Sequence, residues 1–544
     1  MKPTLQSWRH GASLLLLGAA HAQAFAPEPL PAVLLPYVQL LCLAFLARVV
    51  WRAPSVKGAA ATGFLFGLGS FAVGLYWIFI SLHRYGGMAA PLASVAVLLL
   101  AAGEALFYGA AAAAAKWLAG RGLREGDGYA RHFLAIAAWA SCWTLAEWLR
   151  GTLFTGFPWM AVGYAHVDGP LAGWAPIIGM YGLTWLAAFI CGAVGLLMHL
   201  QRSGREAPAA ATVAGAIALA LIGWVLGGLS WGQADGRPVL MRLVQGNVPQ
   251  SEKFDPALMQ QGIETYMQLA ALPPRQPDMN PAVIVLPETI VPLFQDRYAP
   301  QFWDQWRQIA AQRGAGIIMG VPLHSRGPEG ERYTNSAIGF DGATSVERLV
   351  SGSTAMRYDK HHLVPFGEFV PPGFRWFVDA MHIPLGDFDR GETRQTHFEL
   401  AGQRFAPNIC YEDVFGEEII RGVRDSAEHG PGASILVNMS NLGWFGESWA
   451  LRQHLQISRM RALETARPMV RATNTGMTAA IDPDGHVRAL LDAHVKGVLD
   501  VEVQGMAGIT PYVRAGNWPV LAWSLLAVAA VLLRRRASRA AAAS

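Results

Sequence analysis

The chain carries little charge for its length. Only 15% of its 544 residues are Asp, Glu, Lys or Arg, against about 25% in an average soluble domain. The net charge of +4 is too small to indicate a nucleic-acid partner. Hydrophobic residues make up 52% of the chain, and many lie in stretches of about 20 residues, enough to cross a hydrocarbon core. The composition therefore predicts a membrane protein.

Cysteine is scarce too, and the spacings typical of metal and nucleotide sites are absent. Three of the four cysteines, Cys42, Cys142 and Cys191, lie in apolar stretches, where cysteine acts as a small hydrophobic residue. Cys410 is alone in the polar part of the chain, which excludes a disulfide framework there. No CxxC, HExxH or Walker A motif occurs. We expect no metal and no cofactor, and we expect Cys410 to be a free thiol.

Apolar segments predict eight membrane spans. We place them at residues 11–27, 31–51, 59–82, 90–118, 132–150, 171–199, 209–231 and 516–533. The first segment has two readings, because Lys2 and Arg9 before a short apolar run also resemble a cleavable signal peptide. Pro29 and Pro31 lead directly into the second segment, as in a helical hairpin, which favours retention of the first.

Basic residues predict the orientation of these spans. They precede the first span, follow the last, and gather in alternate loops between them: Lys2, Arg9, Arg48, Arg52, Lys57, Lys116, Arg121, Arg124, Arg131, Arg202, Arg205 and Arg534–Arg536. The intervening loops hold only Arg84 and, at a span edge, Arg150. Because cytoplasmic loops carry the excess of Lys and Arg, we expect both termini in the cytoplasm. Seven crossings then place residues 232–515 on the opposite face.

Residues 232–515 are predicted to form one α/β domain, in which β-branched runs alternate with amphipathic stretches. The predicted strands are Val239–Val244, Ala282–Leu286, Gly316–Met319, Ser336–Phe340, Arg404–Ile409 and Ala433–Val437. The predicted helices are Pro256–Ala271, Pro300–Arg313, Glu417–Glu428 and Ala450–Arg467. The chain therefore divides into a membrane domain at 1–231, this domain at 232–515, and a final span with a basic tail at 516–544.

Three islands of this domain carry reactive side chains. Glu288 ends one β-like run, Lys360 opens a motif that runs to Glu368, and Cys410 ends another run. An unperturbed thiol, with a pKa near about 8.5, is only slightly ionised at neutral pH and needs a base or a nearby cation. Glu288 can take the proton, and Lys360 can stabilise first the thiolate and then an oxyanion. The three islands predict acyl transfer through a thioester.

These islands resemble the Glu–Lys–Cys triad of the nitrilase superfamily, and nearly the whole chain resembles the bacterial apolipoprotein N-acyltransferases. The motifs that carry the resemblance are Phe154–Trp159, Tyr181–Trp185, Val244–Gln250, Lys360–Glu368, Cys410–Glu412, Gly443–Gly446, Gln453–His454 and Arg461–Glu464. The resemblance implies a multi-pass α-helical membrane protein that carries an α/β domain of the αββα sandwich type. It also implies roles for six residues: Glu288 as general base, Lys360 as oxyanion-stabilising group, Cys410 as nucleophile, and Glu368, Tyr411 and Glu412 as supporting residues.

The resemblance further implies a two-step reaction in the bacterial inner membrane. An acyl chain passes from a phospholipid, typically phosphatidylethanolamine, to Cys410. It then passes to the α-amino group of the N-terminal S-diacylglyceryl cysteine of an apolipoprotein. A water-poor pocket would limit hydrolysis of the thioester. We expect a monomer whose catalytic domain faces the periplasm.

Aromatic side chains are predicted to contact the lipid. Phe254 stands where the family often has Trp, which keeps apolar contact but loses a hydrogen-bond donor. Trp444 and Phe445 lie in a Gly-containing segment, 443–449, and further aromatic residues lie in 366–388. Such loops beside a membrane can dip into it. We expect one of these two segments to act as a lid.

Charged residues at the predicted spans have two readings. Arg150 either pairs with Glu147, three residues before it, or binds a lipid phosphate. Glu104 is expected to face the interior of the helix bundle and to be hydrogen-bonded. Gly67 and Gly69 in the third span indicate close helix packing rather than nucleotide binding.

Two other functions use the same features. A membrane-tethered amidase of the nitrilase type, acting on a soluble amide, would need the same triad. A transporter or receptor could carry an inactive module of this kind. The apolar spans and aromatic loops favour a lipid substrate, and the intact triad argues against an inactive module. His454 is expected to be a structural residue rather than the partner of Cys410.

Overall fold

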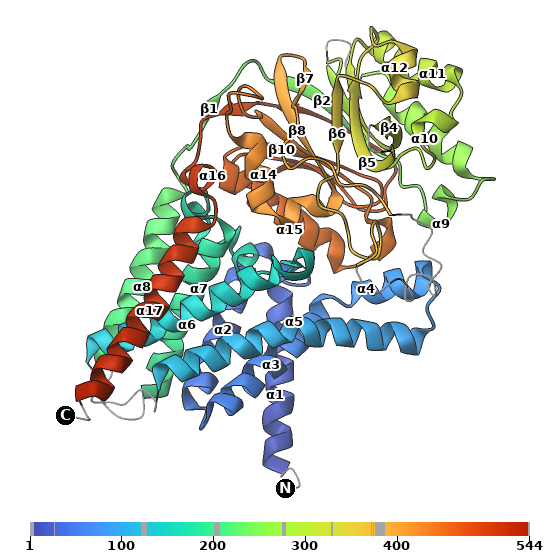
Figure 1. The fold of residues 1–544 in the computed structure, drawn as a ribbon. Helices are drawn as coiled ribbons and strands as arrows, with labels where there is room; N and C mark the ends of the chain where they lie inside the picture. The colour runs from blue at the N-terminus through green and yellow to red at the C-terminus, as the bar shows by residue number, and fades with distance from the viewer. Residues whose placement is uncertain are drawn as a thin grey trace. The chain divides into compact units, whose positions relative to one another are not determined.

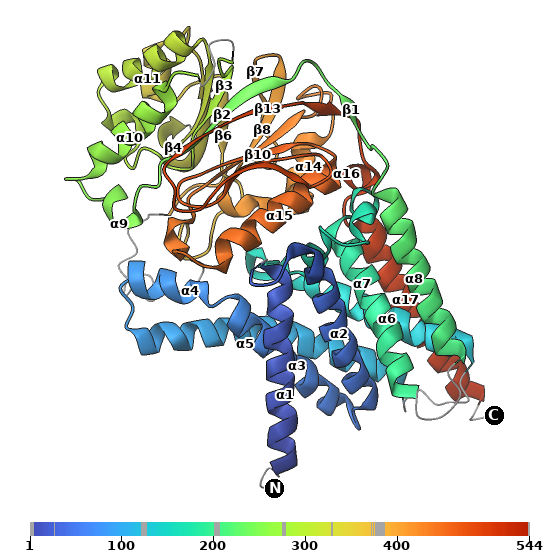
Figure 2. The same cartoon turned by 180° about the vertical axis from the view of Figure 1, so that it is seen from behind.

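The computed structural model describes residues 5–26, 28–120, 128–200, 207–274, 279–327, 330–371, 373, 375 and 387–541. The chain separates into two compact units. A helical unit comprises Met1–Phe79, Ala89–Leu229 and Ala515–Ser544, and a sandwich unit comprises Ile80–Met88 and Ser230–Arg514. Figure 1 and Figure 2 show the helices of the first unit and the sheets of the second from opposite sides.

The helical unit has a helix at each predicted span. These helices are α1 (Leu5–Ala22), α2 (Leu35–Arg52), α3 (Val56–Gly74), α5 (Ala90–Ala119), α6 (Tyr129–Arg150), α7 (Ala175–Leu200), α8 (Ala207–Leu226) and α17 (Trp518–Ala541). Among the residues described, five segments are long and apolar enough to cross a membrane: Ala32–Arg52, Val56–Gly74, Ala90–Ala119, Ala172–Leu200 and Trp518–Ala537. A multi-pass membrane unit is therefore confirmed, whereas the count of eight crossings is not.

Glycine lets α3 approach its neighbours α1 and α5 closely, as the sequence predicted for the third span. A Cβ atom on Gly69 would lie 2.1 Å from the carbonyl oxygen of Leu15. A Cβ atom on Gly67 would lie 3.0 Å from Ala105. In lipid the burial of apolar side chains gives no net free energy of helix association, so close contact of this kind holds the helices together. The third span is shorter than predicted, because α3 ends at Gly74 and a separate short helix, α4 (Trp77–Ile80), follows.

The sandwich unit contains two six-stranded sheets of similar design. One has the order β13-β2-β3-β4-β5-β6, and the other has the order β12-β11-β10-β9-β8-β7. In each sheet three parallel strands, β2–β4 or β8–β10, are flanked by antiparallel ones. The strands are β2 (Val239–Gln245), β3 (Val283–Val285), β4 (Gly316–Gly327), β5 (Gly330–Phe340), β6 (Met356–Asp359), β7 (Phe398–Leu400), β8 (Gln403–Ile409), β9 (Ile435–Ser440), β10 (Met469–Thr473), β11 (Thr478–Ile481), β12 (Val487–Leu491) and β13 (Gly497–Val503).

The sheets pack face to face, and helices cover their outer faces. One apolar core unites Leu243 of the first sheet with Phe405 and Val437 of the second. The outer face of the first sheet packs under α10 (Met259–Ala271), α11 (Pro300–Arg313) and α12 (Val346–Ser351). The outer face of the second packs under α14 (Gly416–Val423), α15 (Trp449–Thr465) and α16 (Pro511–Ala515). This layering, visible in Figure 1, confirms the αββα sandwich.

All six predicted strands are present as β2, β3, β4, β5, β8 and β9. Three predicted helices are present as α10, α11 and α15, but the helix predicted at Glu417–Glu428 was too long and ends at Val423. Beyond that point Asp425 accepts a hydrogen bond from the Gly432 amide at 2.8 Å, and Ser426 accepts one from the His429 amide at 2.9 Å. Short polar side chains that bond nearby backbone in this way compete with helix formation.

Candidate active site

Three strand ends bring the predicted catalytic side chains together. Glu288 follows β3, Lys360 directly follows β6 in the same sheet, and Cys410 directly follows β8 in the other sheet. Since β3 and β8 lie within the parallel groups, Glu288 and Cys410 sit at carboxyl ends of strands, where α/β sheets commonly place reactive groups. Lys360 Nζ lies 3.5 Å from Glu288 Oε1, and the Cys410 thiol interacts electrostatically with both side chains.

The carboxylate of Glu288 is buried and held at both oxygens. Its Oε1 accepts a hydrogen bond from Asn335 Nδ2 at 2.8 Å, and its Oε2 accepts one from the backbone amide of Asn441 at 3.0 Å. Gly320 of β4 leaves room for this segment, since a Cβ atom there would lie 2.6 Å from the Glu288 Cα. The orientation of a prospective general base is thus set before any substrate binds.

Glu368 holds the ammonium group of Lys360. Lys360 Nζ lies 2.8 Å from Glu368 Oε2 and 2.9 Å from Oε1. The same carboxylate accepts hydrogen bonds from Asn335 Nδ2 at 2.6 Å and from the Val364 amide at 2.8 Å. Burial opposes the charge of Lys360, but Glu368, Glu288 and Cys410 outweigh it and raise the pKa of Lys360 above its ordinary value. Lys360 therefore remains a cation at neutral pH.

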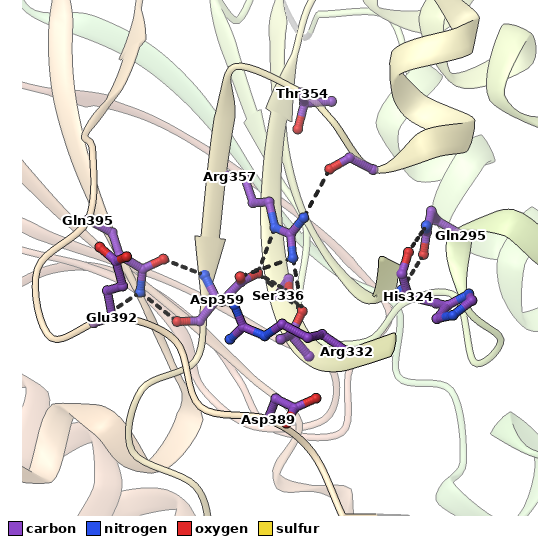
Figure 3. Close-up of polar contacts among 12 residues, drawn as sticks. Gln295, His324, Arg332, Ser336, Thr354, Arg357, Asp359, Asp389, Glu392 and Gln395 are labelled. Atoms are coloured by element: carbon purple, nitrogen blue, oxygen red, sulfur yellow. Dashed lines mark hydrogen bonds and ion pairs between the residues drawn. The ribbon is translucent and has the colours of Figure 1, made fainter. Parts of the chain in front are cut away.

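A second polar network fixes the strand end that carries Lys360. Asp359 accepts hydrogen bonds from Ser336 at 2.7 Å and from Arg357 at 2.9 and 3.0 Å (Figure 3). The side chain of Gln395 accepts from the Asp359 amide at 2.8 Å and donates to its carbonyl at 2.6 Å. These contacts join β5, β6 and the chain beyond residue 390, so the backbone that leads to Lys360 is anchored on both sides.

Cys410 sits on a strained turn at the end of β8. Its φ of 53° lies in the left-handed region, which is unfavourable for a residue with a side chain. It opens a 3-10 turn, Cys410–Val414. Burial, and then the charge of Glu288, raise the pKa of the Cys410 thiol well above its ordinary value, although Lys360 opposes this. The thiol is therefore neutral at neutral pH, and a base would have to take its proton before the sulfur could act as a nucleophile.

Glu412 ties this turn to the segment after Lys360. Its Oε1 accepts hydrogen bonds from the amides of His361 at 2.7 Å and His362 at 3.1 Å. Its Oε2 accepts from the Ile409 amide at 2.7 Å and from the Tyr358 hydroxyl at 2.9 Å. Burial raises the pKa of Glu412 to about 7, against these donors and the charge of Lys360. The carboxylate thereby fixes the spacing of Lys360 and Cys410.

Tyr411 packs against aromatic side chains beside the turn. Its ring makes edge contacts with Phe415 at 5.2 Å and with His362 at 5.8 Å. The His362 ring also stacks on Phe415 at 3.6 Å. These contacts place Tyr411 in an aromatic cluster that supports the backbone after Cys410.

His454 contacts the backbone of Cys410. Its Nε2 lies 3.1 Å from the Cys410 carbonyl oxygen and 2.9 Å from Asp413 Oδ1. Arg471 Nη2 lies 2.9 Å from His454 Nδ1. Because arginine only donates, Nδ1 must accept, and the proton belongs on Nε2. His454 therefore supports the turn as a neutral donor, in agreement with the structural role predicted for it.

Two aromatic residues predicted to contact lipid lie side by side. The rings of Phe254 and Trp444 are 6.4 Å apart, and Tyr85 meets Trp444 edge-on at 5.8 Å. Trp444 and Phe445, both partly buried, belong to a 3-10 turn that begins after Asn441, the residue that donates to Glu288. The apolar rings therefore lie on two chain segments that each contact Glu288, one through Lys253 and the other through Asn441. In the other candidate lid, Phe374, Trp376 and Phe377 lie outside the described residues.

Arg150 belongs to the helical unit, and its partner is not the predicted one. Its Nη1 lies 3.2 Å from Glu104 Oε2 and donates to the carbonyls of Phe157 at 2.5 Å and Trp159 at 2.9 Å. The pairing predicted with Glu147 is wrong: a carboxylate three residues back on the same helix is in reach, but Glu104 on α5 takes the guanidinium. The prediction that Glu104 faces inward and is hydrogen-bonded is confirmed.

Sequence reasoning missed three residues around Glu288. Asn335 bridges Glu288 and Glu368, Asn441 donates its amide to Glu288, and Lys253 Nζ donates to the Glu288 carbonyl at 3.3 Å. No spacing pattern marks a single Asn in a strand or one Lys between Glu252 and Phe254. Their role depends on which strands become neighbours.

This arrangement brings together three groups suited to acyl transfer. It combines a half-buried thiol, a carboxylate held by two hydrogen bonds, and a lysine cation that contacts that carboxylate. Within the described parts of the chain no group of three or more His, Cys, Asp or Glu side chains is placed to hold a metal ion.

Comparisons with known proteins cover both units. Residues 17–193 match the model of the apolipoprotein N-acyltransferase N-terminal domain, and residues 241–512 match that of the carbon-nitrogen hydrolases. The apolipoprotein N-acyltransferase of Bordetella bronchiseptica is 55% identical over 97% of this chain and 98% of that protein. The protein of the same name from Ralstonia nicotianae is 43% identical over 97% of this chain and 94% of its own length. The chain belongs to the apolipoprotein N-acyltransferase family.

Proposed function

We propose that this protein transfers a fatty acyl chain from a membrane phospholipid to the α-amino group of the N-terminal S-diacylglyceryl cysteine of apolipoproteins. The observation that carries the proposal is the Glu288–Lys360–Cys410 cluster in a chain that matches family members over nearly its whole length. The apolar helices of the first unit embed the protein in the membrane, where both lipid substrates reside.

In the first half-reaction the Cys410 sulfur attacks the ester carbonyl of the phospholipid. Glu288 takes the thiol proton as the C–S bond forms, and Lys360 stabilises the oxyanion of the tetrahedral intermediate. The intermediate collapses when the C–O bond breaks. Glu288 returns the proton to the departing alkoxide, which leaves as a lysophospholipid. The raised pKa of Cys410 requires this coupled proton transfer, because little thiolate exists beforehand.

In the second half-reaction the acceptor amine attacks the thioester carbonyl. Glu288 takes a proton from the attacking nitrogen, and Lys360 again stabilises the oxyanion. The C–S bond then breaks, and the sulfur recovers a proton from Glu288 as the amide product leaves. Glu368 supports both steps by keeping Lys360 charged and aimed, and Glu412 and Tyr411 hold the turn that carries the sulfur.

The aromatic rings are proposed to contact acyl chains. Phe254 and Trp444 form an apolar pair next to segments that bear Lys253 and Asn441, and Phe445 follows in the same turn. We assign the segment 443–449, which begins within this turn, as the lid that moves between half-reactions. Arg150 is not assigned to a phosphate, because its contacts hold the chain at Phe157 and Trp159.

The orientation in the membrane is also a proposal. Basic residues at both ends and in alternate loops support eight crossings, cytoplasmic termini and a catalytic unit in the periplasm. A hydrogen bond of 3.1 Å between His21 of α1 and Ser70 of α3 supports retention of the first helix as a span. We expect phosphatidylethanolamine as the acyl donor and a monomeric enzyme. Labelling of single introduced cysteines from the outer face should reach residues 232–515 but not the tail after Arg536.

The decisive experiment uses the full-length protein in detergent. Incubated with phospholipid alone, it should release lysophospholipid in an amount comparable to enzyme and then stall, with an acyl mass on Cys410. Addition of a diacylglyceryl lipopeptide should restart the release. If lysophospholipid appears only when the acceptor is present, the thioester scheme is wrong. If the enzyme hydrolyses simple amides but leaves phospholipid intact, it is a membrane-tethered amidase.

A further inference from the structure

Lys253 is a buried cation that the reaction described above does not use. It ends the short helix α9 (Gln250–Lys253), and its side chain is buried, with 3% of the residue exposed. Its Nζ donates to the Glu288 carbonyl at 3.3 Å and lies 5.9 Å from the centre of the Phe254 ring. Within the described residues it makes no ion pair and no second hydrogen bond. It is thus the least satisfied charge around Glu288.

A buried ammonium group of this kind destabilises the folded state. An ammonium carries three donors, and burial without a counterion is unfavourable. Burial lowers the pKa of Lys253 to about 8, although Glu288 and Cys410 oppose this. Lys360 differs, because Glu368 contacts it through both oxygens. A methionine in place of Lys253 would fill similar space without this penalty, so packing gives no reason for a lysine here.

The net charge of the active site gives a reason for a lysine at this position. Ionised Glu288 and Glu368 carry two negative charges, and Lys360 carries one positive charge, so these three leave a net −1. During acyl transfer this negative charge passes from Glu288 to the sulfur or to the carbonyl oxygen of the substrate. In a low-dielectric site an uncompensated charge is expensive wherever it resides. Lys253 brings the total to zero.

We propose that Lys253 is a second cation of the active site, whose charge offsets the negative charge that moves from Glu288 to Cys410 and the reacting carbonyl. It acts through the electric field at Cys410 and through the Glu288 backbone, so it is a positioning residue rather than a catalytic one. This inference rests on the roles proposed for Glu288 and Cys410.

The test uses the full-length protein and measures how the rate of Cys410 alkylation by iodoacetamide depends on pH. Mass spectrometry of the peptide that contains Cys410 gives the extent of alkylation. The charged groups that act on this thiol are Glu288, Lys360, Glu368, Asp413, Arg471 and Lys253. At pH 7, where Lys253 is charged, Lys253→Met and Lys253→Gln should each slow alkylation and acyl loading about tenfold, and the difference in alkylation should disappear above about pH 8, where Lys253 loses its proton. Lys253→Arg keeps the charge and should stay within about threefold of the wild type. Lys496→Met, at an exposed lysine, is the matched control and should change neither measurement.

The glutamine variant separates charge from hydrogen bonding, because it can still donate to the Glu288 carbonyl. If Lys253→Gln behaves like the wild type, or if neither variant slows alkylation at pH 7, Lys253 is a structural residue and the inference is wrong. Should Lys253→Met fail to fold, the Gln and Arg variants decide the question in the same way. Alkylation needs no lipid, so its outcome is independent of whether wild-type Cys410 acquires an acyl chain, which tests the proposed function.

Discussion

Each unit buries a cluster of charged side chains, yet the two clusters are built from different partners. In the helical unit the Arg150 guanidinium donates to Glu104 and to two backbone carbonyls. In the sandwich unit the Lys360 ammonium contacts, among the described residues, the carboxylates of Glu288 and Glu368. Arg150 therefore fixes a stretch of backbone, whereas Lys360 stands among groups that can exchange protons. A buried charge becomes informative about chemistry only through its partners.

The second acidic residue of the helical cluster shows the same pattern. Glu147 accepts hydrogen bonds from Tyr108 at 2.9 Å, Thr184 at 3.1 Å and the Val162 amide. The chain between Arg150 and Val162 includes non-glycine residues with positive φ at Phe154, Thr155 and Met160. Such conformations persist where surrounding contacts over-determine them. The cluster in the helical unit is thus best explained as the anchor of a strained loop.

The largest expected effect is at Glu288, the proposed general base of the cluster in the sandwich unit. Glu288→Gln keeps the shape of the side chain but removes its ability to take a proton from Cys410. Acyl loading from phospholipid should fall about 10³-fold, measured as the acyl mass on the intact protein. Cys410→Ala should show no acyl mass at all. Normal loading of the Gln variant would remove Glu288 from the role of base.

Arg150→Met tests the contrasting cluster and should act on stability. Loss of the guanidinium leaves Glu104 and two carbonyls buried without their partner, which should cost about 3–5 kcal/mol of unfolding free energy. The double variant Glu104→Gln/Arg150→Met should recover part of this loss. Alkylation of Cys410 in the protein that remains folded should match the wild type. Loss of acyl loading with unchanged thermal stability would instead place Arg150 in substrate binding.

Glu368→Gln should give a smaller effect on the reaction. Lys360 loses the carboxylate that keeps it charged and aimed, so the oxyanion is stabilised less well, and kcat should fall about 10²-fold with little change in KM. Glu399→Gln, at an exposed position of β7, is the matched control. A change in KM alone would indicate that Glu368 shapes the lipid site rather than the cation.

The smallest expected effect concerns pH and Lys253. The pKa of Lys253 is about 8 in the folded protein, below the ordinary 10.5 that the unfolded chain retains. The folded state therefore binds its proton less well, and the resulting penalty is complete below pH 8 and vanishes as pH rises through 10.5. Lys253→Met should be more stable than the wild type at pH 7, by on the order of 1–3 kcal/mol. Thermal unfolding at several pH values checks this, and a less stable variant at pH 7 would contradict it.

The elements that carry the triad could be predicted because their signals are local. The runs before Glu288 and Cys410 are short, apolar and end in a polar residue, and they form β3 and β8. Helices with a clear amphipathic period, such as α10 and α11, were found with nearly correct bounds. Strands β6, β7 and β10 to β13 were not predicted, because propensity in such short segments is decided by the neighbours with which they pair.

What the sequence by itself determined is therefore the membrane character, the α/β domain and the choice of three candidate catalytic side chains, since hydropathy, strand ends and motif order are properties of contiguous residues. Only the tertiary structure decided which groups surround them. Asn335 reaches Glu288 because β5 lies in the same sheet as β3, and Arg471 sets the proton of His454 because β10 lies beneath α15. Arg150 takes Glu104 rather than Glu147 because α5 packs against α6. Each of these contacts joins residues far apart in the chain, and strand order and helix packing alone bring them within reach.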